Sequence, residues 1–448
     1  MIRKMGPLVS VLILVLGDIP AVAQETRRLS PDEAVDLAVK SNLGLQSSQV
    51  ASGMKKRKAD TAWNVFIPSV DAGAALNGLN YKPSASPPMP ESPQWRLILP
   101  SVSASLNLSI ALFEGMRNLR LDYEGGLISY EKAKAQLERD VRKAYYQMLL
   151  LQENIALLRE SLAAAERRVA MAQANYRAGL APELNVLQAQ VGMENMKPQI
   201  DQAENGLKLG MAQFAMYLGI PYDTQFELIP VENLSMFIPL DMKELISTAS
   251  AGKPDIMELK QNILLLESQR KAAFYRVFTP ALTLSWNMNP VVWNNVNGWI
   301  AWEDAWKSQS GGLTISLGFR LNGLLPFGQE QQGLKDIDDN LRSLRIGLAQ
   351  AVRGTEIEIY STVLNLQKVQ TTMDVQSRTV DLAERTYRLT ETAYRAGLQD
   401  LLEVQNAELE LRKARIGILE QNFTYLQGLI DLEYAMGVPF GTLSRSNE

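Results

Sequence analysis

The heptapeptide ANYRAGL at residues 174–180 recurs as TAYRAGL at residues 392–398, 218 residues further along the chain. The same offset, without a gap, pairs Gly219 with Gly437 and continues through the intervening segment. A gapless match of this length predicts two copies of one structural unit. This repeat restricts the chain to folds that can use the same long element twice.

The boundaries of the two units follow from the extent of this match. Towards the N-terminus the offset becomes 212, where VFIPSV at 65–70 faces VFTPAL at 277–282, so we expect short insertions within the units. The predicted organisation is a signal peptide at 1–23, a first unit at 24–221, a connector rich in turn and strand signals at 222–245, a second unit at 246–440 and a tail at 441–448.

The N-terminus resembles a secretory signal. Two basic residues precede an apolar run at 8–16, and Ala21-Val22-Ala23 comes directly before Gln24. The alternative is a membrane anchor, but the run is well short of the ~20 residues that span a bilayer. No later segment reaches 18 consecutive apolar residues. We therefore expect the mature chain to meet a membrane as strands or as a surface helix.

Composition argues against enzymatic chemistry. The chain has no histidine and no cysteine, so it lacks imidazole catalysis, thiol nucleophiles, Cys/His zinc sites and lipidation at a cysteine. A net charge of −4 does not indicate a nucleic-acid partner, and no G-x-x-x-x-G-K-[ST] loop is present. Met193 and Met196 suggest soft-metal transport only weakly, and we predict that they pack in a core. We expect a protein without enzymatic activity, cofactor or metal.

Strict alternation of apolar and small polar residues predicts strands. The segment SVSASLNLSIAL at 101–112 has this pattern, and LTLSWNMN at 282–289 and LTISLGFRLN at 313–322 repeat it. We expect a two-strand hairpin in each unit, with strands at about 69–80, 101–112, 281–290 and 312–322.

The alternation favours a membrane barrel over a soluble sandwich. Four strands offer little surface for burying apolar faces against a second sheet, whereas a barrel turns them towards lipid and lines its lumen with polar side chains. Six of the seven tryptophans lie in or between the strands, as interfacial aromatics would. Because about eight strands are the fewest that close a barrel, this interpretation requires a homo-oligomer.

The remaining sequence predicts very long helices. No proline occurs between Pro100 and Pro182, and apolar residues recur at 4–3 spacing from Leu137 to Tyr176, which is typical of a coiled-coil seam. We expect a helix over 114–178, about 98 Å long at 1.5 Å per residue, with Gly125-Gly126 as the expected site of a bend or an interruption.

Each long helix is expected to end in a tight turn. Gly179 and Gly397 occupy the position where a helix C-cap needs positive φ, so RAGL forms the end of a helical hairpin at about 176–183 and again at 394–401. Pro198 lies inside the first returning helix, while its counterpart is Ile416. We expect a kink in the first hairpin only.

Taken together, these features resemble the TolC-like outer membrane efflux family. Further similar features are LSPDEAVDLAVKSN at the start of the mature region, LFEG at 112–115, PFGQ at 326–329 and the closings LGIP and MGVP. The resemblance implies a mainly helical homotrimer whose helical hairpins form a periplasmic tunnel, an α-barrel, continuous with a twelve-strand outer-membrane β-barrel in contact with lipid. An equatorial region of connector and chain ends would surround the tunnel.

The resemblance also implies a function and partners. The protein would be a passive exit duct, docked through a periplasmic adaptor to an energised inner-membrane transporter. The alternatives are that the chain is itself a periplasmic adaptor or a coiled-coil scaffold of the cell envelope. Both would leave the alternating strands or the second hairpin without a role.

The resemblance assigns two groups of residues at the hairpin tips. Adaptor contacts fall on Arg177, Ala178, Gly179, Leu180, Arg395, Ala396, Gly397 and Leu398, and gate positions fall on Glu403, Asn406, Asn185, Tyr394 and Gln399. Only one of the two acidic gate rings is retained, at Glu403. Asn185 and Gln399 replace the acid and arginine that lock related channels. We therefore predict a closed state held by amide and phenol hydrogen bonds.

Two of these assignments have structural alternatives. Asp400-x-x-Glu403 also fits a helix capping box, in which Glu403 satisfies backbone donors. Arg177 and Arg395 equally fit helix C-termini, where a positive charge opposes the helix dipole.

Overall fold

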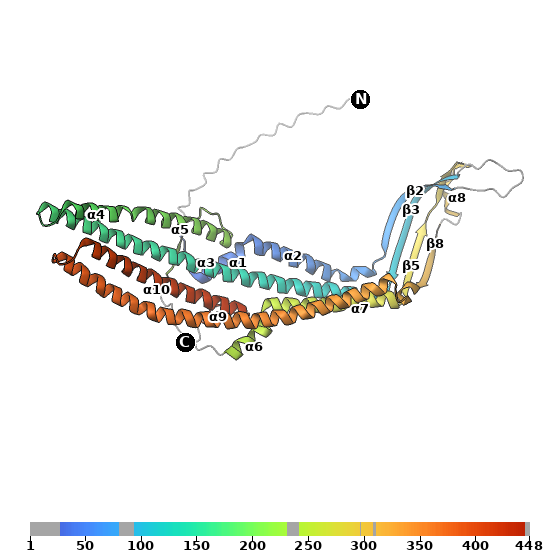
Figure 1. Cartoon of the computed structure of the whole chain (residues 1–448). Coiled ribbons are helices and arrows are strands. Elements are labelled where there is room, and N and C mark those ends of the chain that lie inside the picture. The colour runs from blue at the N-terminus through green and yellow to red at the C-terminus, as the bar shows by residue number, and fades with distance from the viewer. Residues whose placement is uncertain (1–26, 80–93, 231–241, 296, 308–310, 444–448) are drawn as a thin grey trace, which may run out of the picture.

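The computed structural model describes residues 27–79, 94–230, 242–295, 297–307 and 311–443. The predicted signal peptide, part of the connector and most of the tail lie outside these residues. The described chain is mostly helical, with long helices that run side by side and a curled sheet at one end (Figure 1).

Two helices of 67 residues each form the length of the molecule, α3 (Ala111–Arg177) and α9 (Gln329–Arg395). The first residues of the two helices are 218 positions apart, and so are their last residues, which is the offset found in the sequence. α3 begins three residues before the predicted start, and the interruption expected at Gly125-Gly126 is absent because the helix continues through both glycines. The neighbouring Gly126 allows close packing instead, because a Cβ there would lie 2.8 Å from the Lys55 side chain on α2.

The returning helices differ between the two halves. In the first, α4 (Glu183–Glu194) and α5 (Lys197–Leu218) are separate helices, and Pro198 lies in the first turn of α5. In the second, α10 (Leu401–Met436) is unbroken. Proline removes a backbone donor and clashes with the preceding turn, which explains the interruption in one hairpin only. Met196 at this interruption is 7% exposed, consistent with core packing.

Shorter elements cover the middle of the long helices and the half that lies next to the sheet. α1 (Pro31–Ser41), α2 (Leu43–Asp60) and α7 (Pro254–Phe278) pack on α3, and α6 (Met242–Gly252) packs on α9. β1 (Arg27–Leu29) pairs in parallel with β4 (Phe226–Leu228) in the connector. Within the described residues, no helix is both long and apolar enough to span a bilayer.

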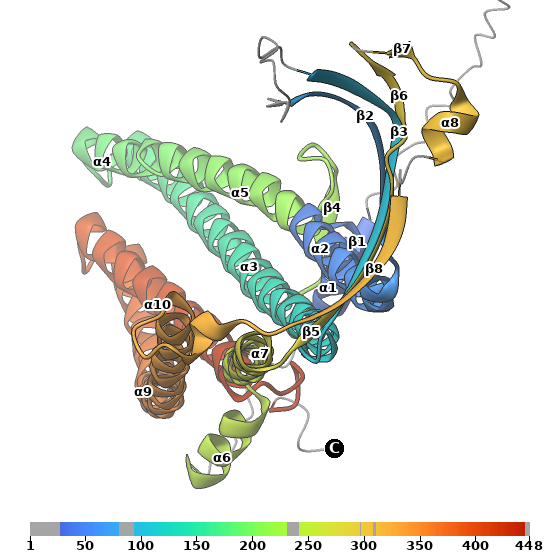
Figure 2. The same ribbon diagram turned by 90° about the vertical axis from the view of Figure 1, so that its right-hand side faces the viewer.

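The sheet consists of antiparallel strands centred on β3. Figure 2 shows it curled into an arc. β3 pairs with β2 along one side and with β5 and β6 along the other, β7 pairs with β6, and β8 pairs with β5. The strands are β2 (Ser69–Leu79), β3 (Gln94–Leu108), β5 (Ala281–Met288), β6 (Val291–Asn294), β7 (Gly298–Trp299) and β8 (Gly311–Gly318).

Several predicted strand limits were wrong. The strand predicted at 101–112 begins at Gln94 and ends at Leu108, because Pro100 and a register shift interrupt its alternation and the helical turn starts at Ser109. The strand predicted at 312–322 ends at Gly318, and the 3-10 turn η2 (Leu321–Leu324) follows. The strands predicted at about 281–290 and 69–80 agree with β5 (Ala281–Met288) and β2 (Ser69–Leu79) to within two residues. β6, β7 and the short helix α8 (Trp302–Lys307) were not predicted.

The register places the alternating side chains in rows across the sheet. Leu106 lies opposite Leu284, which lies opposite Ile315, and this row is apolar. The next row holds Ser105, Ser285 and Thr314 on the other face. Hydroxyl and amide groups interact along the polar face, as in the 2.7 Å bond that Thr283 Oγ1 donates to Asn107 Oδ1. The sheet therefore has one apolar and one polar face.

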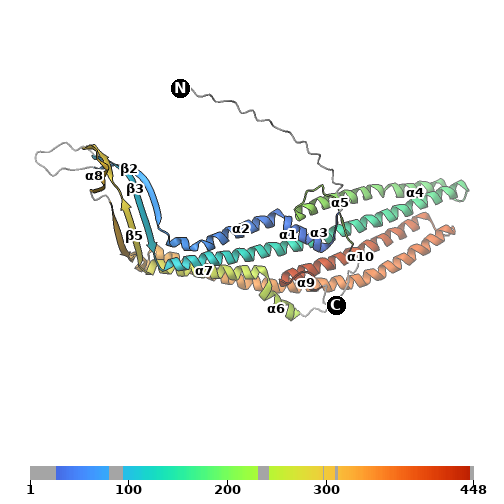
Figure 3. The same cartoon turned by 180° about the vertical axis from the view of Figure 1, so that it is seen from behind.

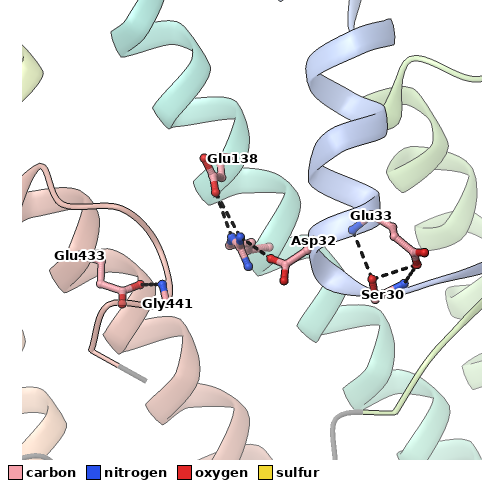
Figure 4. A network of polar contacts seen from close by, with 7 residues as sticks. Ser30, Asp32, Glu33, Glu138, Glu433 and Gly441 are labelled. Atoms are coloured by element: carbon pink, nitrogen blue, oxygen red, sulfur yellow. Dashed lines mark hydrogen bonds and ion pairs between the residues drawn. The ribbon is translucent and has the colours of Figure 1, made fainter. Parts of the chain in front are cut away.

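The chain ends are fastened at mid-length by polar contacts (Figure 4). Arg142 on α3 contacts Asp32 at 2.7 Å and Glu138 at 3.1 Å, and its guanidinium lies 5.7 Å from the Phe440 ring centroid. Glu433 on α10 accepts a 3.0 Å hydrogen bond from the Gly441 backbone. Burial raises the pKa of the Glu433 carboxyl, and this hydrogen bond opposes the shift.

The main core lies at the same level. Tyr145 is fully buried, and its hydroxyl is 2.8 Å from the carbonyl oxygens of both Leu29 and Ile229. It therefore ties β1 and the end of β4 to α3. A second cluster around Leu366 and Leu432 joins α9 to α10 and α6.

Four glycines with positive φ give a matched test of packing. Gly219 has φ 72°, and a Cβ there would lie 2.3 Å from the Ser41 carbonyl oxygen, whereas Gly179 has φ 70° and nothing within 4 Å. Gly437 and Gly397 repeat this contrast, with the Gly252 carbonyl oxygen 2.3 Å from the position of a Cβ on Gly437.

We predict that Gly179→Ala lowers the free energy of unfolding by about 1 kcal/mol, the cost of the left-handed backbone. Gly219→Ala adds a backbone clash and should cost about 3 kcal/mol or more. Denaturant unfolding followed by circular dichroism would measure both. Equal losses for the two variants would contradict the close approach at Gly219.

Candidate functional site

The two copies of the heptapeptide lie at the same end of the molecule, opposite the sheet (Figure 3). α3 ends at Arg177 and α4 starts at Glu183, while α9 ends at Arg395 and α10 starts at Leu401. The structure therefore places all of the sequence-predicted tip residues at one end of the helical body.

Both tips are closed by the same pair of backbone hydrogen bonds. Leu180 N–H donates to the Asn175 carbonyl at 2.8 Å, and Gly179 N–H donates to the Tyr176 carbonyl at 3.0 Å. The equivalent bonds at Leu398 and Gly397 are both 2.9 Å. This is the Schellman arrangement, and it requires the positive φ that Gly179 and Gly397 adopt.

The side chains of the tips point away from the protein. The Schellman arrangement usually packs the residue after its glycine against its own helix, but Leu180 and Leu398 are each 79% exposed. The predicted contact residues are all exposed, namely Arg177, Ala178, Gly179, Leu180, Arg395, Ala396, Gly397 and Leu398. Arg395 pairs with Glu391 at 2.7 Å. Both arginines also lie in the last turn of a helix, so the charge-capping interpretation is compatible with the contact one.

The capping box proposed for Glu403 is absent. Asp400 is the N-cap of α10, but its side chain makes no capping hydrogen bond, and Glu403 is exposed. A complete box exists elsewhere, where the Ser30 backbone donates to Glu33 Oε2 at 2.8 Å and the Glu33 backbone donates to Ser30 Oγ (Figure 4). The carboxylate of Glu403 is therefore not used by its own helix.

The other predicted gate residues are not joined to each other within one chain. Asn406 and Gln399 are exposed, and Asn185 is half-buried on α4. Tyr394 is also half-buried and packs against the cluster of Val169, Ala172, Val186, Ala189 and Leu401. Burial raises the pKa of the Tyr394 hydroxyl, although the charge of Arg168 opposes this. Tyr394 thus connects α9 to the first hairpin by packing.

A buried ion pair that the sequence did not reveal crosses the two hairpins. Arg168 on α3 is 7% exposed and pairs with Glu408 on α10. Tyr387 on α9 hydrogen-bonds to the same guanidinium, and burial raises the pKa of this tyrosine. The repeat offered one signal for the pair, because the positions equivalent to Arg168 and Glu408 hold Thr386 and Gln190.

A second set of charges reinforces this connection. Arg415 on α10 lies 2.6 Å from Glu384 on α9 and 3.3 Å from Glu160 on α3. Together with Glu408, these side chains line a groove between α3, α9 and α10. In the part of the chain that the structure covers, no three acidic side chains are grouped so that they could hold a metal ion.

Comparison with solved structures finds the same fold in outer membrane proteins. CusC matches with a TM-score of 0.75 and 16% identity over 91% of this chain and 92% of that chain. The Campylobacter jejuni outer membrane channel CmeC gives 0.74 and 16% over 91% and 85%. VceC from Vibrio cholerae gives 0.72 and 14% over 92% and 96%. At these identities the likeness concerns the fold alone. A search of curated protein sequences found no significant match.

The sequence itself matches a family model described as outer membrane efflux protein. The match covers residues 35–219 and 245–438, which leaves out only the ends and the connector. Proteins of this family are channels of the outer membrane rather than enzymes. The long helical hairpins, the curled sheet and this match over most of the chain lead to one conclusion: the protein is a member of the outer membrane efflux protein family.

Proposed function

We propose that three copies of this chain form a passive exit duct that carries substrates from the periplasm through the outer membrane. The observation that carries the proposal is the sheet, which has an apolar and a polar face and unpaired edges at β2 on one side and at β8 and β7 on the other. Backbone groups inside a bilayer must be paired, so a sheet in lipid has to close. One copy has too few strands to close a barrel.

The strand directions support closure between copies. β2 runs from the helices towards the distal end of the sheet and β8 runs back, so a β8 edge placed beside the next copy's β2 continues the antiparallel order. Counting β2, β3, β5 and β8, with β6 extending β5, three copies supply twelve strands. The row of Leu313, Ile315 and Leu317 on β8, each at least 63% exposed, would then face lipid.

The helices would continue the barrel as a tunnel. α10 contacts both α9 and α3, so α9 lies at one flank of the helical layer and α4 and α5 at the other. Both flanks carry exposed apolar side chains, such as Leu382 and Leu389 on α9 and Leu187 and Val191 on α4. These flanks would meet between copies, with the chain ends forming a belt around the tunnel.

The tips would dock a periplasmic adaptor that links the duct to an inner-membrane transporter. Leu180 and Leu398 support this role because their own turns leave them uncovered, and three copies would present six such leucines. The chain has no phosphate-binding loop, so the transporter would supply the energy.

The entrance would be controlled by Glu403 and by the contacts between the hairpins. Three Glu403 carboxylates around a narrow pore would favour cations. The Arg168–Glu408 pair would hold α10 against α3 in the closed state, in place of the amide and phenol hydrogen bonds expected from the sequence. A buried pair is weak evidence of a stabilising role, and Arg168 Nη1 has no hydrogen-bond partner among the described residues. These observations favour a conformational role.

Adaptor docking predicts a position-specific crosslink. A photoreactive phenylalanine at position 398 should capture a periplasmic protein with a helical hairpin, identified by mass spectrometry. The same group at Ser377 should not capture it, because this exposed position on α9 lies about 27 Å from the end of the helix at Arg395. Leu180→Asp combined with Leu398→Asp should abolish transport without changing assembly. Equal capture from positions 398 and 377 would refute docking at the tips.

The pore role of Glu403 predicts a change in selectivity. Glu403→Gln should weaken cation preference and divalent block in single-channel recordings, because the ring loses its charge. Thermal stability should stay the same, since Glu403 makes no capping bond. Unchanged conduction would exclude Glu403 from the pore.

The Arg168–Glu408 pair predicts a leak when it is broken. Arg168→Met and Glu408→Gln should each raise the open probability, and the double variant should add little, as expected for groups that act as a pair. Lys197→Met removes an exposed pair with Glu194, 2.6 Å apart, and serves as the control. Additive effects of the two substitutions, or a leak in the control, would argue against a lock.

A further inference from the structure

The short helix α8 lies outside the curve of the sheet. Figure 2 shows it on the convex side, next to β6 and β7. It contacts β6, and Ala305 within the helix is 1% exposed. The free edges of the sheet are β2 on one side and β8 together with the two-residue β7 on the other, so α8 lies beside β6, close to the distal end of this second edge.

The register of the strands fixes the level of α8 along the sheet. Before the helix, Trp299 lies opposite Trp293, which lies opposite Leu97 on β3. After the helix, Gly311 lies opposite Met288, which lies opposite Val102 on β3. The two strands that flank α8 therefore reach β3 at levels about five residues, or ~16 Å, apart, and α8 belongs to the segment that connects these levels.

The same register shows that the row formed by Leu97, Trp293 and Trp299 lies on the apolar face of the sheet. Leu76 on β2 lies opposite Leu97, and Ala72 lies opposite Val102. Residues 72 and 76 are four apart on one strand, so their side chains share a face. Leu97, Trp293 and Trp299 therefore continue the face on which Val102 lies, across the whole width of the sheet.

Along the sheet, α8 lies at the distal boundary of the apolar face that extends from Leu97 to Leu108. From Leu97 to Leu108 the strand rises ~36 Å, which is about 28 Å along the barrel axis at a tilt of about 40°. The apolar band of outer membrane barrels is about 25 Å tall and has aromatic residues at both rims. At the rim next to the helices, Phe319 and Phe327 are 43% and 92% exposed. Trp299 and α8 lie at the other rim.

The helix itself has the side-chain distribution of an interfacial element. Trp302 and Trp306 stack with centroids 6.3 Å apart and are 52% and 51% exposed. At 100° per residue, Glu303 and Asp304 project to the opposite side of the helix. Indole rings prefer the boundary between headgroups and acyl chains, and carboxylates prefer water.

We propose that α8 is a membrane-interface helix that seats Trp299, Trp302 and Trp306 in the headgroup region of the distal leaflet. It would fix the depth and rotation of the barrel in the bilayer. This assignment rests on the proposed function, because it needs the sheet to lie in the membrane. The occupant of the tryptophan surface is lipid, since the apolar face of the sheet continues into it without a break.

The absence of cysteine makes a depth measurement direct. Single variants Trp306→Cys, Leu313→Cys and Ser105→Cys would carry an environment-sensitive fluorophore in assembled channels in phosphatidylcholine vesicles. Quenching would be compared for lipids with a nitroxide on the headgroup, lipids with a nitroxide at the centre of the acyl chain, and aqueous iodide. Trp302→Cys provides a second reporter if Trp306→Cys does not assemble.

We expect the probe at position 306 to be quenched about threefold more by headgroup nitroxides than by acyl-centre nitroxides, as for a side chain at the interface. The probe at 313 should show the reverse order, and the probe at 105 should respond to iodide only. Quenching at 306 by iodide alone would place the helix in water, and quenching by none of the three would mean that another copy covers it. Either result overturns the proposal. A probe at 313 that no lipid quenches would overturn the membrane placement itself.

Discussion

The unpaired edges of the sheet limit the ways in which this chain could be placed in a membrane. Along β2 and β8 a row of backbone N–H and C=O groups lacks partners within one chain, and hydrocarbon offers none. The cost of leaving such groups unpaired in lipid is several kcal/mol each. Closure with further copies removes the edges, and the antiparallel order of the strands makes copies of this chain suitable partners. Under the proposed function, the sheet would therefore enter a membrane only as part of an oligomer.

The helical part follows from the same closure. Each strand pair is continuous with a 67-residue helix, so copies joined through their sheets must also place their helices in one layer. The hairpin turns at Gly179 and Gly397 then gather at the far end, where Leu180 and Leu398 remain uncovered. Selective or gating groups are expected where the two halves differ. Arg168 and Glu408 differ from their counterparts Thr386 and Gln190.

The sequence predicted features that depend on local periodicity and failed where tertiary contacts decide. The spacing from Leu137 to Tyr176 indicated α3, and Pro198 indicated a kink in the first hairpin, where the structure has a full break between α4 and α5. The strand β3 was misplaced because Pro100 and a register shift disturb its alternation. The helix α8 has only six residues, too few for a periodic signal.

The tip residues show the same division. The positive φ of Gly179 and Gly397 was predicted, because RAGL is a local turn signal. The partner of Arg168 was not, because it lies 240 residues away and no local pattern specifies that contact. The capping box at Glu403 was wrong for a related reason. The motif permits the bond, but the backbone around Asp400 forms the helix start without it.

The central claim is that three copies close through the β2 and β8 edges, and disulfide crosslinking tests it most directly. Because the chain has no cysteine, one cysteine in β2 and one in β8 can be scanned in pairs along the two strands and oxidised in intact membranes. The account predicts that at least one register gives a covalent product of three chains and nothing larger on denaturing gels. Products that stop at two chains, or a ladder that continues beyond three, would contradict it.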